Sequence, residues 1–303
     1  MYSSRRVQFP GDTTFDVYTE FQINYMNYLT GCLIPNTEVR VGDERWMQVN
    51  SLGCKGEELD PGLGTIGFFG DSATFGMALS RHAADRWPFH ARIHGYQALN
   101  AAVEGHCFER ISARYAELSA RVDLAAVVVG GTWHNLAYNE SGEQAWASFL
   151  ARFEGARVLA ICTLATSLVP ESCERGLDDL IAGRAGRTPF LPWGDWPATA
   201  AKTREAYEAV LRYNAFVRRY CRRTGAVLID LFNAYRPASY EEMPDMFRDP
   251  AHALPDLYPR LGRCVREALA TYLPAGVTDP ASDIDLALAV ESQQANPNVY
   301  PLW

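Results

Sequence analysis

The stretch "LAAVVVGGT" occupies residues 124–132 and is the clearest strand in the chain. Its apolar, largely β-branched residues continue without alternating with polar ones, which is typical of a strand buried on both faces of a sheet. Two glycines then end the run. A strand of this kind usually belongs to a parallel sheet that helices cover on both sides, so the neighbouring segments decide whether the chain has that fold.

The neighbouring segments agree with a parallel sheet. Four more short apolar runs lie in the chain: "TIGFFG" (65–70), one within "ARIHGYQALNAAV" (91–103), "ARVLAICTLA" (156–165) and "AVLIDLF" (226–232). Between the runs, apolar residues recur every three or four positions, as in helices with one buried face. The longest such stripe stops at Gly225, which is a typical residue to follow a helix end. Strands that alternate with helices predict a three-layer α/β/α sandwich with a central parallel sheet.

Four parts of the chain differ in pattern. Residues 1–62 lack a clear period and are expected to form an N-terminal extension, and residues 63–273 carry the α/β domain. Within that domain, residues 166–200 contain "TPFLPWGDWP" and are predicted to be an insertion and a candidate lid, because such long connections are usually functional or disordered. Residues 274–303 are expected to form a C-terminal tail.

Composition excludes several classes of function. The 303 residues carry a net charge of −8, which disfavours binding to nucleic acid. No stretch approaches the roughly 18 apolar residues of a membrane span, and the N-terminus lacks the apolar core of a secretory signal. Seven scattered cysteines without a CxxC pair argue against a zinc ribbon or disulfide framework and favour a reducing, cytoplasmic location. The composition leaves the oligomeric state open.

No motif in the sequence predicts a cofactor or metal site. "GLGTIG" at 62–67 matches GxGxxG, but the strand follows it where a dinucleotide site needs the strand before it, so we interpret it as a loop. The histidines at 82, 90, 94 and 106 lack metal-ligand spacing. We therefore expect neither an organic cofactor nor a metal.

Two short stretches contain residues of the kind that act in serine hydrolases. "GFFGDSATFG" at 67–76 ends a strand on Ser72, which could be a nucleophile or a helix cap; Thr74 stands where a GxSxG elbow has its second glycine, which disfavours that kind of nucleophile turn. "RDPAH" at 248–252 supplies Asp249 and His252. This spacing can place the carboxylate against the histidine Nδ1 atom while Nε2 points outward, although DxxH alone is also common in surface loops.

Taken together, four blocks in this order resemble the SGNH hydrolases, also called GDSL esterases. They are "GDS" (70–72), "NAAVEG" (100–105), "GGTWHN" (130–135) and "DPAH" (249–252). A segment before them, "VNSLGCKGEEL" (49–59), is similar to an Asn-Ser-x-Gly-x-Arg-Gly segment of many members. The resemblance covers residues 49–272 and implies a flavodoxin-like sheet with an SGNH-like catalytic domain.

The resemblance also implies roles for individual residues. Ser72 would be the nucleophile, His252 the base and Asp249 the acid that orients it. The oxyanion hole would consist of the backbone N–H groups of Ser72 and Gly105 and an asparagine side chain. The third block departs from the family's Asn-Asp pattern, because it has "TWHNL" here. We favour Asn135 as the donor, with His134 as the alternative.

The function that follows is a serine esterase or acyl hydrolase. It would cleave the O-acyl group of a small molecule, a sugar or a natural product through an acyl-enzyme, without a cofactor. Two alternatives remain at this stage. The same Ser-His-Asp site would serve an acyltransferase, and the unusual third block would also suit a non-catalytic SGNH-like binding protein.

Overall fold

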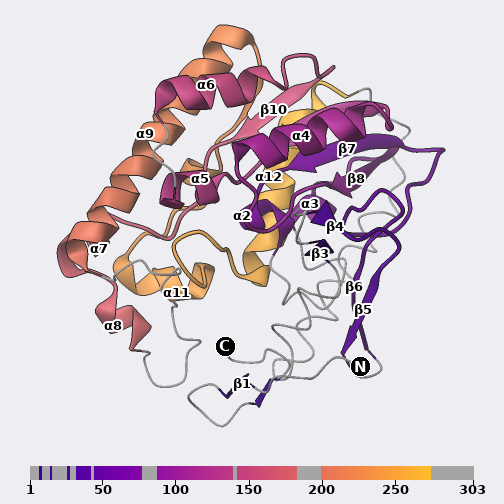
Figure 1. The fold of residues 1–303 in the computed structure, drawn as a ribbon. Coiled ribbons are helices and arrows are strands. Elements are labelled where there is room, and N and C mark those ends of the chain that lie inside the picture. Colours follow the sequence, from indigo (N-terminus) through magenta and orange to yellow (C-terminus); the bar gives the residue numbers. More distant parts are fainter. Residues whose placement is uncertain are drawn as a thin grey trace.

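The computed structural model describes most of the chain, including every predicted site residue (Figure 1). The described residues are 7–8, 14–15, 26–27, 32–41, 44–76, 87–138, 142–182 and 199–273.

Five parallel strands form the central sheet; four of them lie within an apolar run, and the first begins one residue before its run. They are β7 (Gly64–Phe69), β8 (Tyr96–Asn100), β9 (Leu124–Val129), β10 (Leu159–Cys162) and β11 (Val227–Ile229). Their order across the sheet is β11-β10-β9-β7-β8, with every pairing parallel. Numbered along the chain, this is the order 2-1-3-4-5 of flavodoxin-like sheets. The predicted fold is therefore confirmed.

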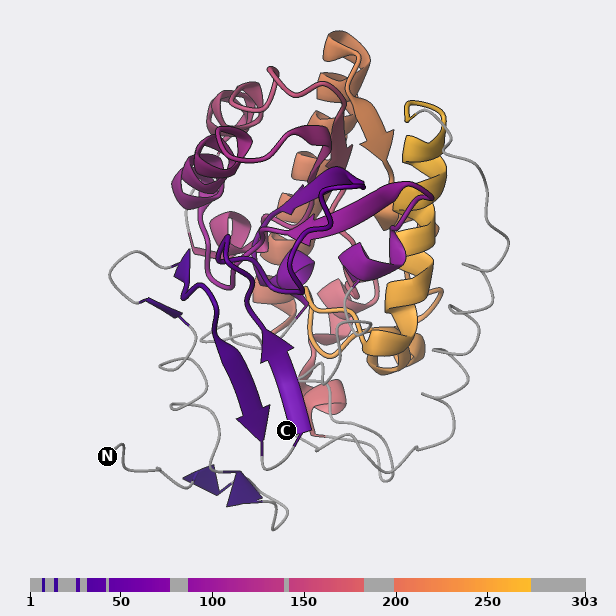
Figure 2. The same cartoon turned by 90° about the vertical axis from the view of Figure 1, so that its right-hand side faces the viewer.

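Helices cover both faces of this sheet (Figure 2). On one face, α3 (Trp87–His90) packs against α12 (Tyr258–Ala270). On the other face lie α4 (Phe108–Ser119), α6 (Glu143–Ala151) and α9 (Ala200–Thr224), which pack side by side. The side chains of β9 are almost all buried between these layers, as its unbroken apolar run predicts.

The two ends of α9 show how local sequence sets a helix boundary. Thr199 precedes the helix, and its side chain accepts a hydrogen bond from the Lys202 N–H group. At the other end Gly225 has φ 79° and donates its N–H to the Cys221 carbonyl at 2.9 Å. This left-handed conformation costs glycine little, so the helix ends where the sequence predicts.

Shorter elements connect the layers. They are α2 (Ser72–Phe75), α5 (Trp133–Tyr138), α7 (Ser172–Arg175), α8 (Asp178–Ile181), α10 (Leu231–Ala234), α11 (Met243–Met246) and the 3-10 turns Tyr240–Glu242 and Pro255–Leu257. None of the helices in the described ranges is both long and apolar enough to cross a bilayer.

The first part of the predicted insertion belongs to the body of the domain. Residues 166–182 contain α7 and α8, and α7 packs against α9. Leu168, Val169 and Leu180 are buried in the main hydrophobic core. The prolines and tryptophans of "TPFLPWGDWP" lie in 188–197, outside the described residues, as does the predicted tail 274–303.

The predicted N-terminal extension contains three antiparallel strand pairs. They are β1 (Val7–Gln8) with β2 (Thr14–Phe15), β3 (Met26–Asn27) with β4 (Cys32–Leu33), and β5 (Glu38–Val41) with β6 (Glu44–Gln48). The residues after β6 differ from these pairs, because Val49 and Cys54 are buried and Cys54 belongs to the main core. The end of the extension is thus packed as part of the α/β domain.

Candidate active site

The first and third sequence blocks meet at the carboxyl ends of β7 and β9. These neighbouring strands flank the point where the strand order of the sheet reverses. Sheets of this kind bind their ligands at that point, outside the carboxyl ends of the strands. The fold therefore places Ser72, which follows β7, and Asn135, which follows β9, on the edge where a site is expected.

Asp71, and not Ser72, caps the short helix α2. The Asp71 Oδ1 atom accepts a hydrogen bond from the Ala73 N–H group at 3.0 Å, and its backbone carbonyl accepts from Thr74 and Phe75. Ser72 is thus the first helical residue, and its hydroxyl is not used for capping. Because α2 has only four residues, its start offers the N–H groups of one turn rather than the dipole of a long helix.

Ser72, His252 and Asp249 form one chain of hydrogen bonds. The His252 Nε2 atom lies 2.8 Å from Ser72 Oγ, and His252 Nδ1 lies 2.7 Å from Asp249 Oδ2. His252 and Asp249 are both buried. An ionised carboxylate only accepts hydrogen bonds, so Nδ1 carries the proton and the neutral ring accepts the Ser72 hydroxyl at Nε2. This is the arrangement in which a histidine can take a proton from a serine.

The charges around His252 favour its protonated form. Burial lowers the pKa of His252, but the adjacent Asp249 carboxylate, and then Asp71, raise it, so that the pKa lies above its ordinary value of 6.5. Burial raises the pKa of Asp249, yet the His252 charge and three hydrogen bonds outweigh it and the pKa is lowered. The pair is therefore suited to stabilise a proton on His252 during a reaction.

The loop that carries Asp249 and His252 is held both by itself and by the segment after β10. Asp249 Oδ1 accepts the backbone N–H groups of Ala251 at 2.8 Å and of His252 at 2.9 Å. The Pro250 carbonyl accepts the Thr166 hydroxyl at 2.8 Å and the Ser167 N–H group at 3.4 Å. No motif in the sequence marks residues 166 and 167 for this contact.

Gly105, the last residue of the second block, has a backbone conformation that favours glycine. Its φ is 69°, and a Cβ atom placed there would meet nothing within 4 Å. The residue is therefore needed for its conformation rather than to leave space. The block is tied to the first one, since the Val103 N–H group donates to the Gly70 carbonyl at 3.3 Å.

The third block places Asn135 and His134 in different environments. Asn135 is buried, and its Oδ1 atom accepts the Phe108 N–H group at the start of α4 at 2.8 Å. Its amide nitrogen has no acceptor among the described residues. His134 is half-buried, and its backbone N–H donates to Asp71 Oδ2 at 2.8 Å. Asn135 thus has a fixed amide with its NH₂ end left for another acceptor.

Thr74 explains the first glycine of "GGTWHN", Gly130, and also Gly70. Its hydroxyl oxygen accepts the Gly131 N–H group at 2.5 Å. A Cβ atom at Gly130 would lie 2.2 Å from this oxygen, and one at Gly70 would lie 2.3 Å from it. Only glycine allows the strand ends to approach α2 so closely, and the approach sets the distance between the first and third blocks.

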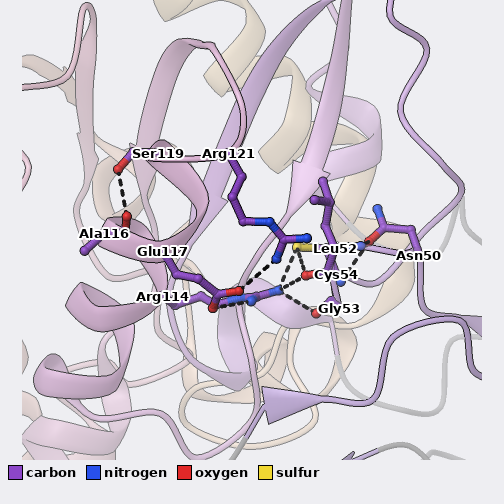
Figure 3. A network of polar contacts seen from close by, with 9 residues as sticks. All are labelled: Asn50, Leu52, Gly53, Cys54, Arg114, Ala116, Glu117, Ser119 and Arg121. Atoms are coloured by element: carbon purple, nitrogen blue, oxygen red, sulfur yellow. Dashed lines mark hydrogen bonds and ion pairs between the residues drawn. The ribbon is translucent and has the colours of Figure 1, made fainter.

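An arginine on α4 holds the segment that precedes the α/β domain (Figure 3). Arg114 Nη2 donates to the carbonyls of Leu52 at 2.6 Å and Gly53 at 2.7 Å, and it lies 3.1 Å from the Cys54 sulfur. Asn50 closes the same turn, because its Oδ1 atom accepts the N–H groups of Leu52 and Cys54. Burial raises the pKa of the Cys54 thiol to about 11. Since α4 follows Gly105 closely, this clamp also supports the second block.

Lys55 extends the same segment toward α2. Its side chain is buried, and Nζ donates to the Gly76 carbonyl at 2.8 Å and lies 4.4 Å from the centre of the Phe75 ring. Its backbone N–H donates to the Asn100 carbonyl at the end of β8. Lys55 stands where the resembled segment has arginine, so the segment keeps a cation at this position.

The comparisons with known proteins agree with the fold. No protein-family model and no curated protein sequence matches the chain. Among solved structures, it is similar to a lipase/acylhydrolase from Enterococcus faecalis (15% identity, 71% of this chain and 100% of that one, TM-score 0.47). It is also similar to a putative lipolytic protein of the G-D-S-L family from Desulfitobacterium hafniense (11% identity, 68% and 99%, TM-score 0.47). The structural neighbours are thus from the family that the four blocks resemble, and the likeness is one of fold.

The described residues contain no group of three or more histidine, cysteine, aspartate or glutamate side chains placed to hold a metal ion. Of the four histidines named above, His82 lies outside the described ranges.

Proposed function

We propose that this protein is a serine esterase that cleaves a carboxylic ester of a small molecule through an acyl-enzyme. The observation that carries the proposal is the chain of hydrogen bonds from Ser72 through His252 to Asp249, with 2.8 Å and 2.7 Å between the atoms. This chain lies beside the switch point of the sheet, which is where sheets of this kind bind their ligands.

The reaction would proceed in two halves. Ser72 Oγ attacks the ester carbonyl while its proton passes to His252 Nε2. The tetrahedral intermediate collapses, and His252 returns the proton to the departing alcohol. Water then repeats the sequence, with His252 as base, and releases the carboxylic acid. Each step uses groups of the protein and its substrate only. A second alcohol in place of water would make the enzyme an acyltransferase, so the acceptor is identified from the products.

The oxyanion would be held by the backbone N–H groups of Ser72 and Gly105 and by the Asn135 amide. We favour Asn135 over His134 because Phe108 occupies the oxygen end of its amide. The NH₂ end is then a donor at every pH, whereas a histidine donor depends on its tautomer and charge.

The decisive test is covalent labelling with a fluorophosphonate probe, together with turnover of an activated ester. Wild-type protein is expected to be labelled at Ser72, and Ser72→Ala is expected to lose about 10³–10⁶ in kcat without unfolding. Ser119→Ala, an exposed serine of α4 that bonds only locally, serves as the matched control. Turnover by folded Ser72→Ala would overturn the assignment. A folded wild-type protein that resists labelling would instead support a non-catalytic binding protein.

We also propose a cytoplasmic location. It is supported by the seven cysteines, all of which are free, with Cys54, Cys162, Cys173 and Cys221 buried. Fractionation of host cells tests it, and recovery of the protein outside the cytoplasm would contradict it.

A further inference from the structure

Asp71 makes more contacts to the site than a helix cap requires. The residue is fully buried. One carboxylate oxygen, Oδ1, accepts the Ala73 N–H group of α2 at 3.0 Å, and the other, Oδ2, accepts the His134 N–H group of α5 at 2.8 Å. Its own backbone N–H donates to the Gly131 carbonyl at 3.0 Å. A single residue thus joins the nucleophile helix to the segment that carries Asn135.

These contacts need a carboxylate rather than any polar side chain. Both oxygens accept N–H groups from different elements. An asparagine would keep the cap with its oxygen but would present its NH₂ group to the His134 N–H, donor against donor. A serine would keep only the cap, because its single hydroxyl cannot reach in two directions. The two contacts therefore require a side chain with two acceptor oxygens, which neither asparagine nor serine supplies.

The charge of Asp71 also faces the general base. Burial raises the pKa of Asp71 above its ordinary value, and the N–H groups of His134 and Ala73 and the charge of His252 offset this only in part. Three charged groups act on the buried His252: Asp249 and Asp71 raise its pKa, and Arg248 lowers it. Asp71 is thus a second negative charge that favours the protonated ring of His252. The side-chain hydrogen bonds of Asp71 that the described residues show go to the backbone of Ala73 and His134.

We propose that Asp71 is a positioning residue of the esterase site: its buried carboxylate holds the third block against the nucleophile helix and supports the protonated state of His252. This inference rests on the proposed function for its effect on turnover. Its effect on His252 does not, because that effect exists in the resting protein.

The test compares Asp71→Asn with wild type by two measurements. The first is ester turnover. We expect kcat to fall about 10- to 100-fold, with a smaller change in KM, because even a small displacement of the catalytic groups lowers the rate by up to about 100-fold. The second is an NMR titration of His252, identified by the signal that disappears in His252→Gln. The titration of His252 is expected to move to lower pH, because a negative charge facing it has been removed.

Asp123→Asn is the matched control, since it removes the same charge from an exposed pair with Arg157 at the amino end of β9. It is expected to leave both measurements unchanged. A purely structural role of Asp71 would lower stability but would not move the His252 titration beyond the control.

The outcomes separate the two proposals. Wild-type protein without esterase activity sinks the proposed function, and the titration still tests the link between Asp71 and His252. A folded Asp71→Asn with wild-type kcat, or with an unmoved His252 titration, overturns the inference. If Asp71→Asn does not fold, Asp71→Ser, which keeps the cap, replaces it in both measurements with the same expectations. Failure of both variants to fold would make Asp71 a residue of the folding core and also overturn the inference.

Discussion

The loop that carries Asp249 and His252 and the third block at 130–135 reach the same site by different means. The loop is largely self-sufficient, because Asp249 bonds the ring of His252 and the backbone N–H groups of residues 251 and 252 within four residues. The third block depends on other elements: Asp71 of the first block and Thr74 of α2 hold its backbone, and the start of α4 holds the Asn135 amide. Residue spacing in the sequence can predict a site that is held within one loop, but it cannot predict one that other elements hold in place.

The most damaging change should be the one that breaks the self-sufficient loop. Asp249→Asn removes the acceptor that fixes the His252 tautomer, so we expect kcat to fall by about 10⁴. Steady-state turnover of an activated ester measures the loss. Asp256→Asn, an exposed aspartate a few residues further on, should leave kcat unchanged. A loss below tenfold for Asp249→Asn would mean that the loop does not orient the base.

The third block should respond less, and its response identifies the donor. Asn135→Ala is expected to lower kcat by about 10²–10³, the usual cost of one oxyanion donor, and His134→Ala by much less. Asn135→Asp sharpens the test, because it keeps an acceptor for the Phe108 N–H group but supplies no donor. If His134→Ala shows the larger loss, His134 is the donor. Wild-type rates for all three variants would remove the third block from the catalytic site.

The pH dependence reports on His252, the base that the self-sufficient loop carries. His252 must be neutral to accept the serine proton, and its pKa is raised above 6.5. The acid limb of kcat/KM is therefore expected to have its midpoint above pH 6.5, with activity falling about tenfold per unit below it. Asp249→Asn, through its residual activity, should move the limb to lower pH, because the strongest influence raising the pKa is lost. A wild-type midpoint below 6.5 would contradict this account of the charges.

The smallest effect is expected where the third block rests on α2. Thr74→Val removes the oxygen that accepts the Gly131 N–H group, and leaving this half-buried amide unpaired should lower the unfolding free energy by about 1 kcal/mol. The resulting shift of the third block should also lower kcat, by roughly tenfold or less. Thr65→Val makes the same isosteric change at a buried threonine near the start of β7. Denaturant unfolding and turnover are measured for both variants, and an equal kcat in the two would show that Thr74 is structural only.

The sequence and the structure agree most closely where residues act through neighbours in the chain. The run at 124–132 predicted β9, Gly225 predicted the end of α9, and the spacing of Asp249 and His252 predicted their contact. Agreement is weaker for residues 166–200. The irregular pattern there predicted an insertion and a candidate lid, but residues 166–182 form the short helices α7 and α8, α7 packs against α9, and several of their apolar residues are buried in the main core. The segment before the domain is likewise placed by contacts far along the chain: Arg114 bonds the Leu52 carbonyl, and Lys55 bonds the Gly76 carbonyl.

The sequence by itself therefore determined the sheet, its covering helices and the identity of Ser72, Asp249 and His252 as candidate site residues. The sheet and helices depend on apolar periodicity and on glycine's backbone freedom, which are local in the chain. The three site residues follow from the three-residue spacing of Asp249 and His252 together with the resemblance of the four blocks to the SGNH hydrolases. Only the tertiary structure decided that Asp71 is the cap, that the Asn135 amide is oriented by Phe108, and that Arg114 clamps the segment before the domain. Each of these is a hydrogen bond between elements that the sheet brings together, and a bond of that kind has no period or spacing in the sequence.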